Sequence, residues 1–272
     1  MKKNLRVGAL INELVTNPCV TYSMEYFCKK FDVAKSSLSE DVDAANEAMS
    51  ILGNGEIRTS PGVGGGIKYV PGISDEECRI VQSELARRLS EPKRILGGGF
   101  LYTNDILYDS HLVYKMAQIF SRKFANLDAD YIVTVETKGI PLASAVSFVL
   151  NIPLVVIRRE AKYAEGATVS INYFSGSYDR IQRMSISKLA VKFGKTAIII
   201  DDFMRGGGSL KGISEILAEF NISVAAIGVA TVQRDPSKKR VSSYFPLTIL
   251  ENIDEKGKTI NVSINDFLAD CK

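Results

Sequence analysis

Residues 196–209 constrain the fold more than any other segment, because the run TAIIIDDFMRGGGS passes from apolar to acidic to glycine-rich. Thr196 to Ile200 is an apolar run with β-branched residues, typical of a strand buried on both faces of a parallel sheet. We expect this strand to stop at Asp201 and a helix to begin near Leu210. The glycines between them free backbone N–H groups at the positive end of that helix. The segment therefore predicts a phosphate site at the edge of an α/β sheet.

The two acids before the glycines add a second kind of ligand group. Adjacent residues of a strand project to opposite sides, so one carboxylate can face a ligand while neighbouring groups hold the other. Carboxylates accept hydrogen bonds and therefore suit sugar hydroxyls rather than phosphate. A purely structural interpretation of this segment stays open, because many α/β crevices contain such a turn and Ser209 could simply cap the helix. No Lys-Ser/Thr pair follows the glycines, so this is not the nucleoside triphosphate P-loop.

Composition limits the function classes. The chain has 272 residues, 46% hydrophobic and 24% charged, which is ordinary for a soluble protein of two domains. No apolar run reaches membrane-spanning length and the start lacks a secretory signal, so we expect a cytoplasmic protein without membrane partners. The four cysteines have no Cys-x-x-Cys spacing, which argues against a zinc site. His111, the only histidine, argues against histidine-based metal binding or catalysis.

Residues 1–73 have the pattern of a winged helix. Apolar residues at helical spacing predict three helices, and the third is expected to open with a capping box at Ser37-Leu38-Ser39-Glu40. Two short strand-like segments, 57–59 and 67–70, follow it and are joined by the glycine-rich tip 62–66. In a winged helix the third helix enters the major groove of double-stranded DNA and the wing lies along the backbone. We therefore expect DNA as a partner.

Contacts to DNA would come from basic residues of the first two helices and the wing and from the polar start of the third helix. The candidate DNA-contacting residues are Lys3, Arg6, Tyr22, Lys29, Lys30, Lys35, Ser36, Ser37, Ser39, Arg58 and Lys68. Residues 1–72 contain eight basic and eight acidic residues, so DNA binding requires the basic ones to gather on one face. A dimerisation or protein-binding module remains the alternative.

Residues 74–272 alternate between helix and strand patterns, which predicts a parallel α/β core. Helices are expected from Ser74, over 112–124 and over 141–150, with strands at 131–135 and 153–157. The loop Glu136-Thr137-Lys138-Gly139 follows the first of these strands, so it can converge with the acidic loop at the strand ends. The glycine triplet 97–99 is either a bare hinge or the border of a ligand site.

Further cations follow the strand at 153–157. Arg158, Arg159 and Lys162 could engage a polyanion, although exposed basic residues are often only solvated surface. A hairpin of 168–174 and 180–186 comes next, and the alternating tail from Leu247 to Ile264 predicts edge strands.

The order of these parts resembles the purine operon repressors of Gram-positive bacteria over nearly the whole chain. Segment 196–209 resembles the phosphoribosyl pyrophosphate (PRPP) motif of type I phosphoribosyltransferases, and Lys138-Gly139 their pyrophosphate loop. The 168–186 hairpin resembles their mobile hood loop. Arg205, Gly206 and Ser209 depart from the lysine, alanine and threonine more usual in the family, and Gly206 adds loop freedom that could weaken effector binding.

The resemblance implies an α/β protein in which a winged helix-turn-helix, 1–73, precedes a type I phosphoribosyltransferase-like parallel sheet flanked by helices, 74–272. It implies a homodimeric repressor of purine biosynthesis genes that binds operator DNA and is released by PRPP. No cofactor is required; PRPP would bring Mg²⁺ on its own phosphates, and guanosine tetraphosphate is a further candidate effector. An active purine phosphoribosyltransferase with an appended DNA-binding domain is the alternative. The candidate effector-binding residues are Tyr102, Glu136, Thr137, Lys138, Gly139, Arg158, Arg159, Lys162, Asp201, Asp202, Phe203, Met204, Arg205, Gly206, Gly207, Gly208 and Ser209.

Overall fold

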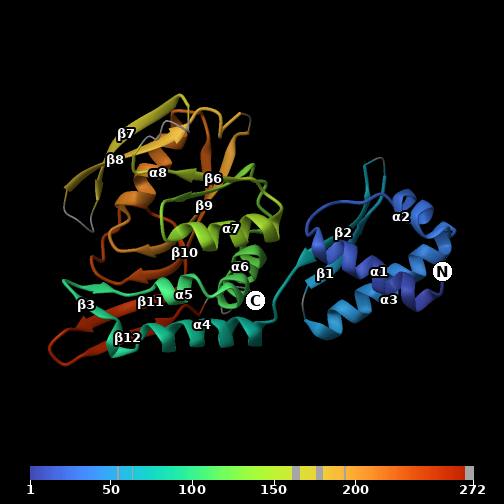
Figure 1. Ribbon diagram of the computed structural model, residues 1–272, viewed down its shortest axis with the longest axis horizontal. Helices are drawn as coiled ribbons and strands as arrows, with labels where there is room; N and C mark the ends of the chain where they lie inside the picture. Colours follow the sequence, from blue (N-terminus) through green and yellow to red (C-terminus); the bar gives the residue numbers. More distant parts are fainter. Residues whose placement is uncertain (54, 63, 161–165, 176–179, 193, 267–272) are drawn as a thin grey trace.

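The computed structural model describes residues 1–272 except 54, 63, 161–165, 176–179, 193 and 267–272. Its amino-terminal part is a bundle of three helices followed by a two-stranded antiparallel hairpin (Figure 1). The elements are α1 (Lys3–Thr16), α2 (Met24–Phe31), α3 (Lys35–Leu52), β1 (Gly55–Ser60) and β2 (Gly66–Pro71). Apolar side chains from all five elements share one core. This arrangement confirms the expected winged helix.

The start of α3 differs from the prediction. The helix begins at Lys35, its cap residue Ala34 makes no side-chain hydrogen bond, and the predicted capping box at Ser37 is therefore wrong. Asp32 ends α2 in the left-handed conformation, with φ of 53°. The amide of Val33 then donates to the carbonyl of Cys28 at 3.1 Å, which turns the chain directly into the next helix. The tight connection fixes the helix start three residues before the position that the serine pattern suggests.

The second part is an α/β domain built on a six-stranded sheet (Figure 1). Its helices are α4 (Asp75–Leu89), α5 (Asn104–Leu107), α6 (Ser110–Phe124), α7 (Gly139–Leu150) and α8 (Gly208–Ala218), with a 3₁₀ turn, η1, at Pro92–Arg94. Its strands are β3 (Ile95–Gly97), β4 (Phe100–Leu101), β5 (Tyr131–Val135), β6 (Leu154–Ile157), β7 (Thr168–Ser175), β8 (Arg180–Ser187), β9 (Thr196–Met204), β10 (Ser223–Gln233), β11 (Phe245–Asp254) and β12 (Thr259–Ile264).

The sheet order is β12-β11-β10-β9-β5-β6, with every pair parallel except the edge pair β11–β12. The central strand β9 is buried on both faces. Ile198 and Ile200 belong to the core beneath α4, α6 and α7, whereas Ala197 and Ile199 belong to the core beneath α8 and the β7–β8 hairpin. This alternation confirms the predicted buried strand and the parallel α/β class.

Two boundaries of the glycine-rich segment were predicted wrongly. Strand β9 does not stop at Asp201 but runs to Met204, because β10 continues beside it and pairs Val229 with Asp201 and Val232 with Met204. Helix α8 begins at Gly208, two residues earlier than expected. The acid pair therefore lies within the last residues of strand β9 and not in a loop.

The connection between the two parts is short and held by side chains. Ser74 caps α4 by accepting a hydrogen bond from the amide of Glu77 at 3.1 Å, as predicted. From α6, Gln118 donates to the carbonyl of Gly72 at 3.4 Å and Arg122 to that of Ile73 at 2.9 Å. Along the part of the chain that the structure describes, no helix is both long and apolar enough to cross a membrane.

Candidate functional site

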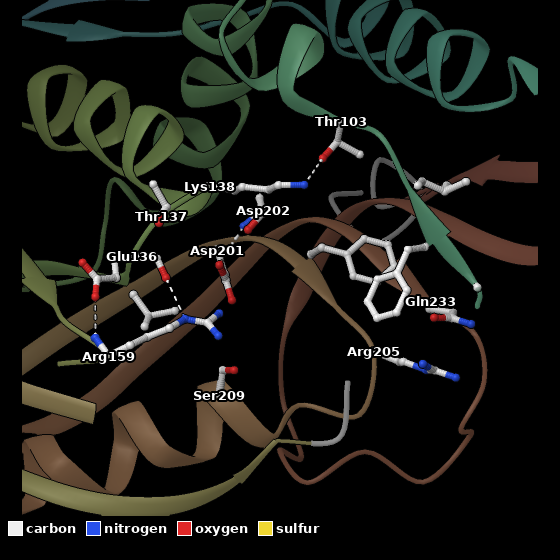
Figure 2. Close-up of a pocket in the computed structure, with 15 residues that line it drawn as sticks. Thr103, Glu136, Thr137, Lys138, Arg159, Asp201, Asp202, Arg205, Ser209 and Gln233 are labelled. Atoms are coloured by element: carbon white, nitrogen blue, oxygen red, sulfur yellow. Dashed lines mark hydrogen bonds between the residues drawn. The ribbon is translucent and has the colours of Figure 1, made fainter. Parts of the chain in front are cut away.

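A pocket of about 380 Å³ opens at the carboxyl ends of β5 and β9 (Figure 2). The loop after β5 and the end of β9 form its floor, and the β3–β4 hairpin forms a wall. The predicted effector residues that line it are Glu136, Thr137, Lys138, Arg159, Asp201, Asp202, Phe203, Arg205 and Ser209. The structure thus brings together the two segments that the sequence placed at neighbouring strand ends, the loop after β5 and the acidic end of β9.

The acid pair is the electrostatic centre of this pocket. Asp201 is 5% exposed, and its Oδ1 accepts a hydrogen bond from the amide of Asp202 at 3.0 Å. Burial, reinforced by the charge of Asp202, raises the pKa of Asp201 well above its ordinary value. Burial also raises the pKa of Asp202. Two carboxyls held close together in this way favour a ligand that offers hydroxyl donors or a cation.

A glycine lets the neighbouring helix approach the acids. A Cβ atom on Gly139, the first residue of α7, would lie 2.4 Å from Thr134 Oγ1 and 2.9 Å from Asp201 Oδ1. Any side chain at this position would push the helix start away from β9. Gly139 therefore sets the spacing between the pocket's two loops without lining the pocket itself.

Two cations border the acid pair, Lys138 on one side and Arg159 on the other (Figure 2). Lys138 Nζ donates to Thr103 Oγ1 at 3.3 Å across the pocket. The backbone amide of Arg159 donates to Glu136 Oε1 at 2.6 Å, and its side-chain Nε donates to the Glu136 carbonyl at 3.3 Å. Glu136 also accepts from Arg158 Nη1 at 3.1 Å. Glu136 therefore orients the arginines, and Arg159 is the one that reaches the pocket.

The glycine loop forms a smaller hollow beside the main pocket, lined by Asp201 and residues 203–210. Gly206, Gly207 and Gly208 all line this hollow, and Gly207 has a positive φ of 76°. Met204 also lines it, although its side chain is buried in the core. The hollow sits at the start of α8, where unpaired backbone N–H groups and the helix dipole favour an anion.

Some candidate residues lie elsewhere. Tyr102 is 44% exposed and does not line the pocket, because its amide is tied to the carbonyl of Arg94 at 2.8 Å while its neighbours on both sides face inward. Arg158 does not line the pocket either. Lys162 falls outside the described residues. The β7–β8 hairpin packs on α8, with Tyr173 against Gly212, and its described residues do not line the pocket.

Sequence reasoning missed several pocket residues. These are Phe100, Leu101, Thr103, Val135 and Gln233. The glycine triplet 97–99 was the available signal, since all three glycines adopt positive φ at the turn of the β3–β4 hairpin and Gly99 lines the pocket. Of its two interpretations, the border of a pocket is the one that the structure shows.

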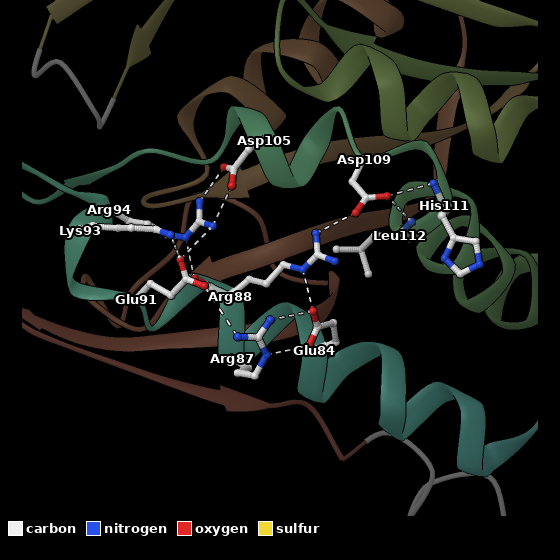
Figure 3. Close-up of polar contacts among 10 residues, drawn as sticks. All are labelled: Glu84, Arg87, Arg88, Glu91, Lys93, Arg94, Asp105, Asp109, His111 and Leu112. Carbon is white, nitrogen blue, oxygen red and sulfur yellow. Dashed lines mark hydrogen bonds and ion pairs between the residues drawn. The ribbon is translucent and has the colours of Figure 1, made fainter.

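The pocket wall is held from behind by Arg94 (Figure 3). Its guanidinium binds Asp105 through two hydrogen bonds of 2.6 and 2.8 Å, and it donates to the carbonyls of Arg88 at 2.6 Å and Tyr102 at 3.1 Å. Arg88 in turn binds Glu84 and Asp109, the cap residue of α6. Arg87, together with Arg88, lowers the pKa of Glu84 to about 2. The network ties the wall to α4, the helix that follows the winged helix.

In the winged helix, the start of α3 presents an exposed polar surface. Lys35, Ser36 and Ser39 are exposed, whereas Ser37 is half-buried. Tyr22 packs its ring 5.5 Å from that of Phe27. Lys68 is half-buried on β2.

Most of the basic candidates already have acidic partners. Three exposed pairs join Lys3 to Glu40, Lys29 to Glu25 and Arg58 to Glu56, and a fourth joins exposed Lys30 to the partly buried Glu13. Arg6 differs from these, because it binds the fully buried Asp41 through two hydrogen bonds of 2.6 and 3.1 Å. This pair joins α1 to α3, so Arg6 has a structural contact that the sequence did not reveal.

Comparison with known proteins agrees with this architecture. Residues 2–71 match the family described as bacterial purine repressor, N-terminal, and residues 104–267 match the phosphoribosyl transferase domain. The purine biosynthesis transcriptional repressor PurR of Bacillus subtilis is 39% identical, over 98% of this chain and 94% of its own. The purine biosynthesis transcriptional activator PurR of Lactococcus lactis subsp. lactis is 33% identical, over 99% of this chain and 100% of its own.

A solved structure supports the fold of the second domain. Adenine phosphoribosyltransferase from Thermoanaerobacter pseudethanolicus superposes with a TM-score of 0.52 at 20% identity, over 61% of this chain and 98% of its own. The winged helix, the phosphoribosyltransferase sheet and the full-length relatives confirm the expected resemblance. This chain belongs to the family of purine biosynthesis transcriptional regulators, in which a purine repressor domain precedes a phosphoribosyltransferase domain.

Proposed function

We propose that this protein represses purine biosynthesis genes by binding operator DNA as a homodimer and that PRPP releases it. One observation carries the proposal: a single chain joins a winged helix to a pocket that combines an acid pair, two cations and a glycine loop. PRPP offers the matching groups, namely ribose hydroxyls, a pyrophosphate and a 5′-phosphate.

Each part of PRPP has a chemically suited partner in the pocket. Asp201 and Asp202 would accept hydrogen bonds from the ribose hydroxyls, and the loop 206–209 would hold the 5′-phosphate through backbone N–H groups. Lys138 and Arg159 would bind the pyrophosphate, since a polyanion needs several cations.

Magnesium fits the same arrangement as a companion of PRPP. Within the described ranges, no group of three or more His, Cys, Asp or Glu side chains is placed to hold a metal ion. Mg²⁺ commonly binds through one or two carboxylates together with substrate phosphates. The two acids at the pocket floor are of the right type for this shared coordination.

The release of DNA follows from linkage. If PRPP binds the DNA-free state more tightly than the DNA-bound state, PRPP lowers operator affinity, and operator DNA lowers PRPP affinity by the same factor. The phosphoribosyltransferase domain then acts as a sensor and needs no turnover. The full-length relatives are named as regulators, which supports a sensor over the alternative, a purine phosphoribosyltransferase.

The decisive experiment measures binding to DNA upstream of purine genes in a gel-shift titration with PRPP and Mg²⁺ varied. We expect operator affinity to fall as PRPP rises; unchanged affinity at saturating PRPP would refute the proposal. Transcription in cells lacking the protein distinguishes a repressor, whose targets rise, from an activator like the Lactococcus relative, whose targets fall. Sedimentation of the DNA-free protein tests the homodimer.

Two further assays complete the test. Incubation with PRPP, Mg²⁺ and each purine base should release no pyrophosphate, and turnover at ordinary enzyme rates would favour the transferase alternative. We also propose guanosine tetraphosphate as a competing effector at the same pocket. It should displace PRPP in an equilibrium competition, and the absence of displacement would exclude it.

A further inference from the structure

Three main-chain carbonyls converge on the ammonium group of Lys239. Its Nζ lies 2.6 Å from the oxygen of Arg205, 2.5 Å from that of Gln233 and 3.2 Å from that of Arg234. An ammonium has three N–H donors, so these three acceptors satisfy it completely. Arg205 and Gln233 both line the pocket, whereas Lys239 lies behind them and is half-buried. Burial lowers the pKa of Lys239.

The segment that carries Lys239 is anchored at both ends. At its start, Arg234 forms an ion pair with Glu251 on β11, and its amide donates to the carbonyl of Leu250 at 2.8 Å. At its end, the guanidinium of Arg240 stacks over the ring of Phe174 at 4.7 Å. The segment therefore provides a fixed support for the glycine loop.

The support determines which way the glycine loop presents its peptide groups. The carbonyl of Arg205 points to Lys239, and the carbonyl of Gly206 accepts a hydrogen bond from the amide of Arg240 at 2.9 Å. In a planar trans peptide, the C=O and the N–H point in opposite directions. The N–H groups of Gly206 and Gly207 are therefore turned away from the Lys239 segment, toward the side on which an anion can bind.

We infer that Lys239 is a positioning residue for the 5′-phosphate of the effector: by holding the carbonyl of Arg205, it keeps the glycine loop's N–H groups directed at that phosphate. This inference rests on the proposed function and names a residue that touches no ligand atom. The hydrogen bond from Lys239 to the Arg205 carbonyl also offsets the conformational freedom of Gly206, because a loop already held in its binding geometry loses less conformational entropy when the ligand binds.

The test compares Lys239→Met with Lys238→Met by calorimetry, using PRPP, ribose 5-phosphate and pyrophosphate as separate ligands. Both variants lose one positive charge from the same segment, but Lys238 is exposed. We expect Lys239→Met to raise the Kd for ribose 5-phosphate and PRPP about tenfold or more, because charged hydrogen bonds that orient the loop are lost. Pyrophosphate, bound by Lys138 and Arg159, should keep its Kd within about twofold, as should every ligand of Lys238→Met.

The three ligands separate positioning from general damage. An equal loss of pyrophosphate binding in Lys239→Met, or no loss of ribose 5-phosphate binding, would overturn the inference. If Lys239→Met does not fold by circular dichroism, Lys239→Gln retains two neutral donors and should show a smaller loss of the same selectivity. If the wild-type protein binds ribose 5-phosphate but not PRPP, the proposed effector is wrong. The Kd values of the variants for ribose 5-phosphate then still test the role of Lys239. If the wild-type protein binds neither, both proposals are refuted.

Discussion

Replacing Arg94 by methionine tests whether the buried guanidinium holds the pocket wall in place (Figure 3). The Arg94 side chain is 3% exposed, and it supplies donors to the carbonyls of Arg88 and Tyr102 as well as to Asp105. Methionine keeps much of the apolar stem but removes every donor. The variant therefore isolates the contribution of the hydrogen bonds from that of packing.

The expected loss follows from what each partner does without Arg94. A hydrogen bond made by a charged group contributes about 1.5–3 kcal/mol. Asp105 is 49% exposed, so water replaces most of its lost interaction. Tyr102 is partly exposed as well, and the Arg88 carbonyl still accepts a hydrogen bond from the amide of Glu91 at 3.2 Å. The loss therefore comes chiefly from the charge-assisted hydrogen bonds of the buried guanidinium itself. We expect the second domain to lose about 2–4 kcal/mol of unfolding free energy.

Urea unfolding followed by circular dichroism measures this loss. Because the protein has two domains, the relevant transition is the one that we expect PRPP, as the proposed ligand, to shift to higher urea. Arg87→Met is the matched control, since Arg87 belongs to the same polar network with a side chain that is 62% exposed and pairs with Glu84 and Glu91. This control should leave the midpoint unchanged. Equal midpoints for the two variants would show that Arg94 does not hold the wall.

Three further predictions concern the acid pair and the DNA surface. Asp201→Asn should stabilise the ligand-free protein increasingly as pH rises above about 4, where the unfolded chain ionises, because a carboxyl whose pKa is raised by folding then costs stability; parallel pH profiles of the two proteins would contradict this. The double variant Asp201→Ala, Asp202→Ala should bind operator DNA but no longer respond to PRPP in a gel shift. Lys35→Ala should weaken operator binding and reduce the salt-dependence slope by about 1, and an unchanged slope would remove Lys35 from the phosphate contacts.

The strands were predictable where their apolar runs were continuous. Strand β5 has the expected bounds, because each of its five residues is buried and no charged residue interrupts the run. The end of β9 was not predictable from the same criterion. Asp201 and Asp202 look like a loop in sequence, yet they remain in the strand because β10 supplies a hydrogen-bonded neighbour. Pairing with β10, a strand distant in sequence, decides where β9 ends, and this pairing cannot be predicted from local composition.

The residues of the site likewise divide into those that the sequence predicted and those that it did not. The acid pair and the glycine loop are contiguous in sequence, so their chemistry could be predicted before their geometry was known. Thr103 and Lys239 could not be predicted, because each contributes through a contact to a residue more than thirty positions away, Lys138 and Arg205 respectively. A threonine or a lysine in a polar loop is unremarkable until the fold places a partner beside it.

The polar contacts around the pocket suggest how a ligand there could change DNA affinity with a small coupling free energy. A tenfold change in operator affinity requires only about 1.4 kcal/mol of coupling, which is the size of one or two hydrogen bonds. A pyrophosphate at Lys138 would compete with Thr103 for the same ammonium, and Thr103 adjoins the wall that Arg94 ties to α4. Arg122 on α6 holds both the Ile73 carbonyl and Asp75 at the start of α4. Polar contacts therefore connect the wall of the pocket with the connection to the winged helix, and rearranging a few of them would supply the required coupling energy.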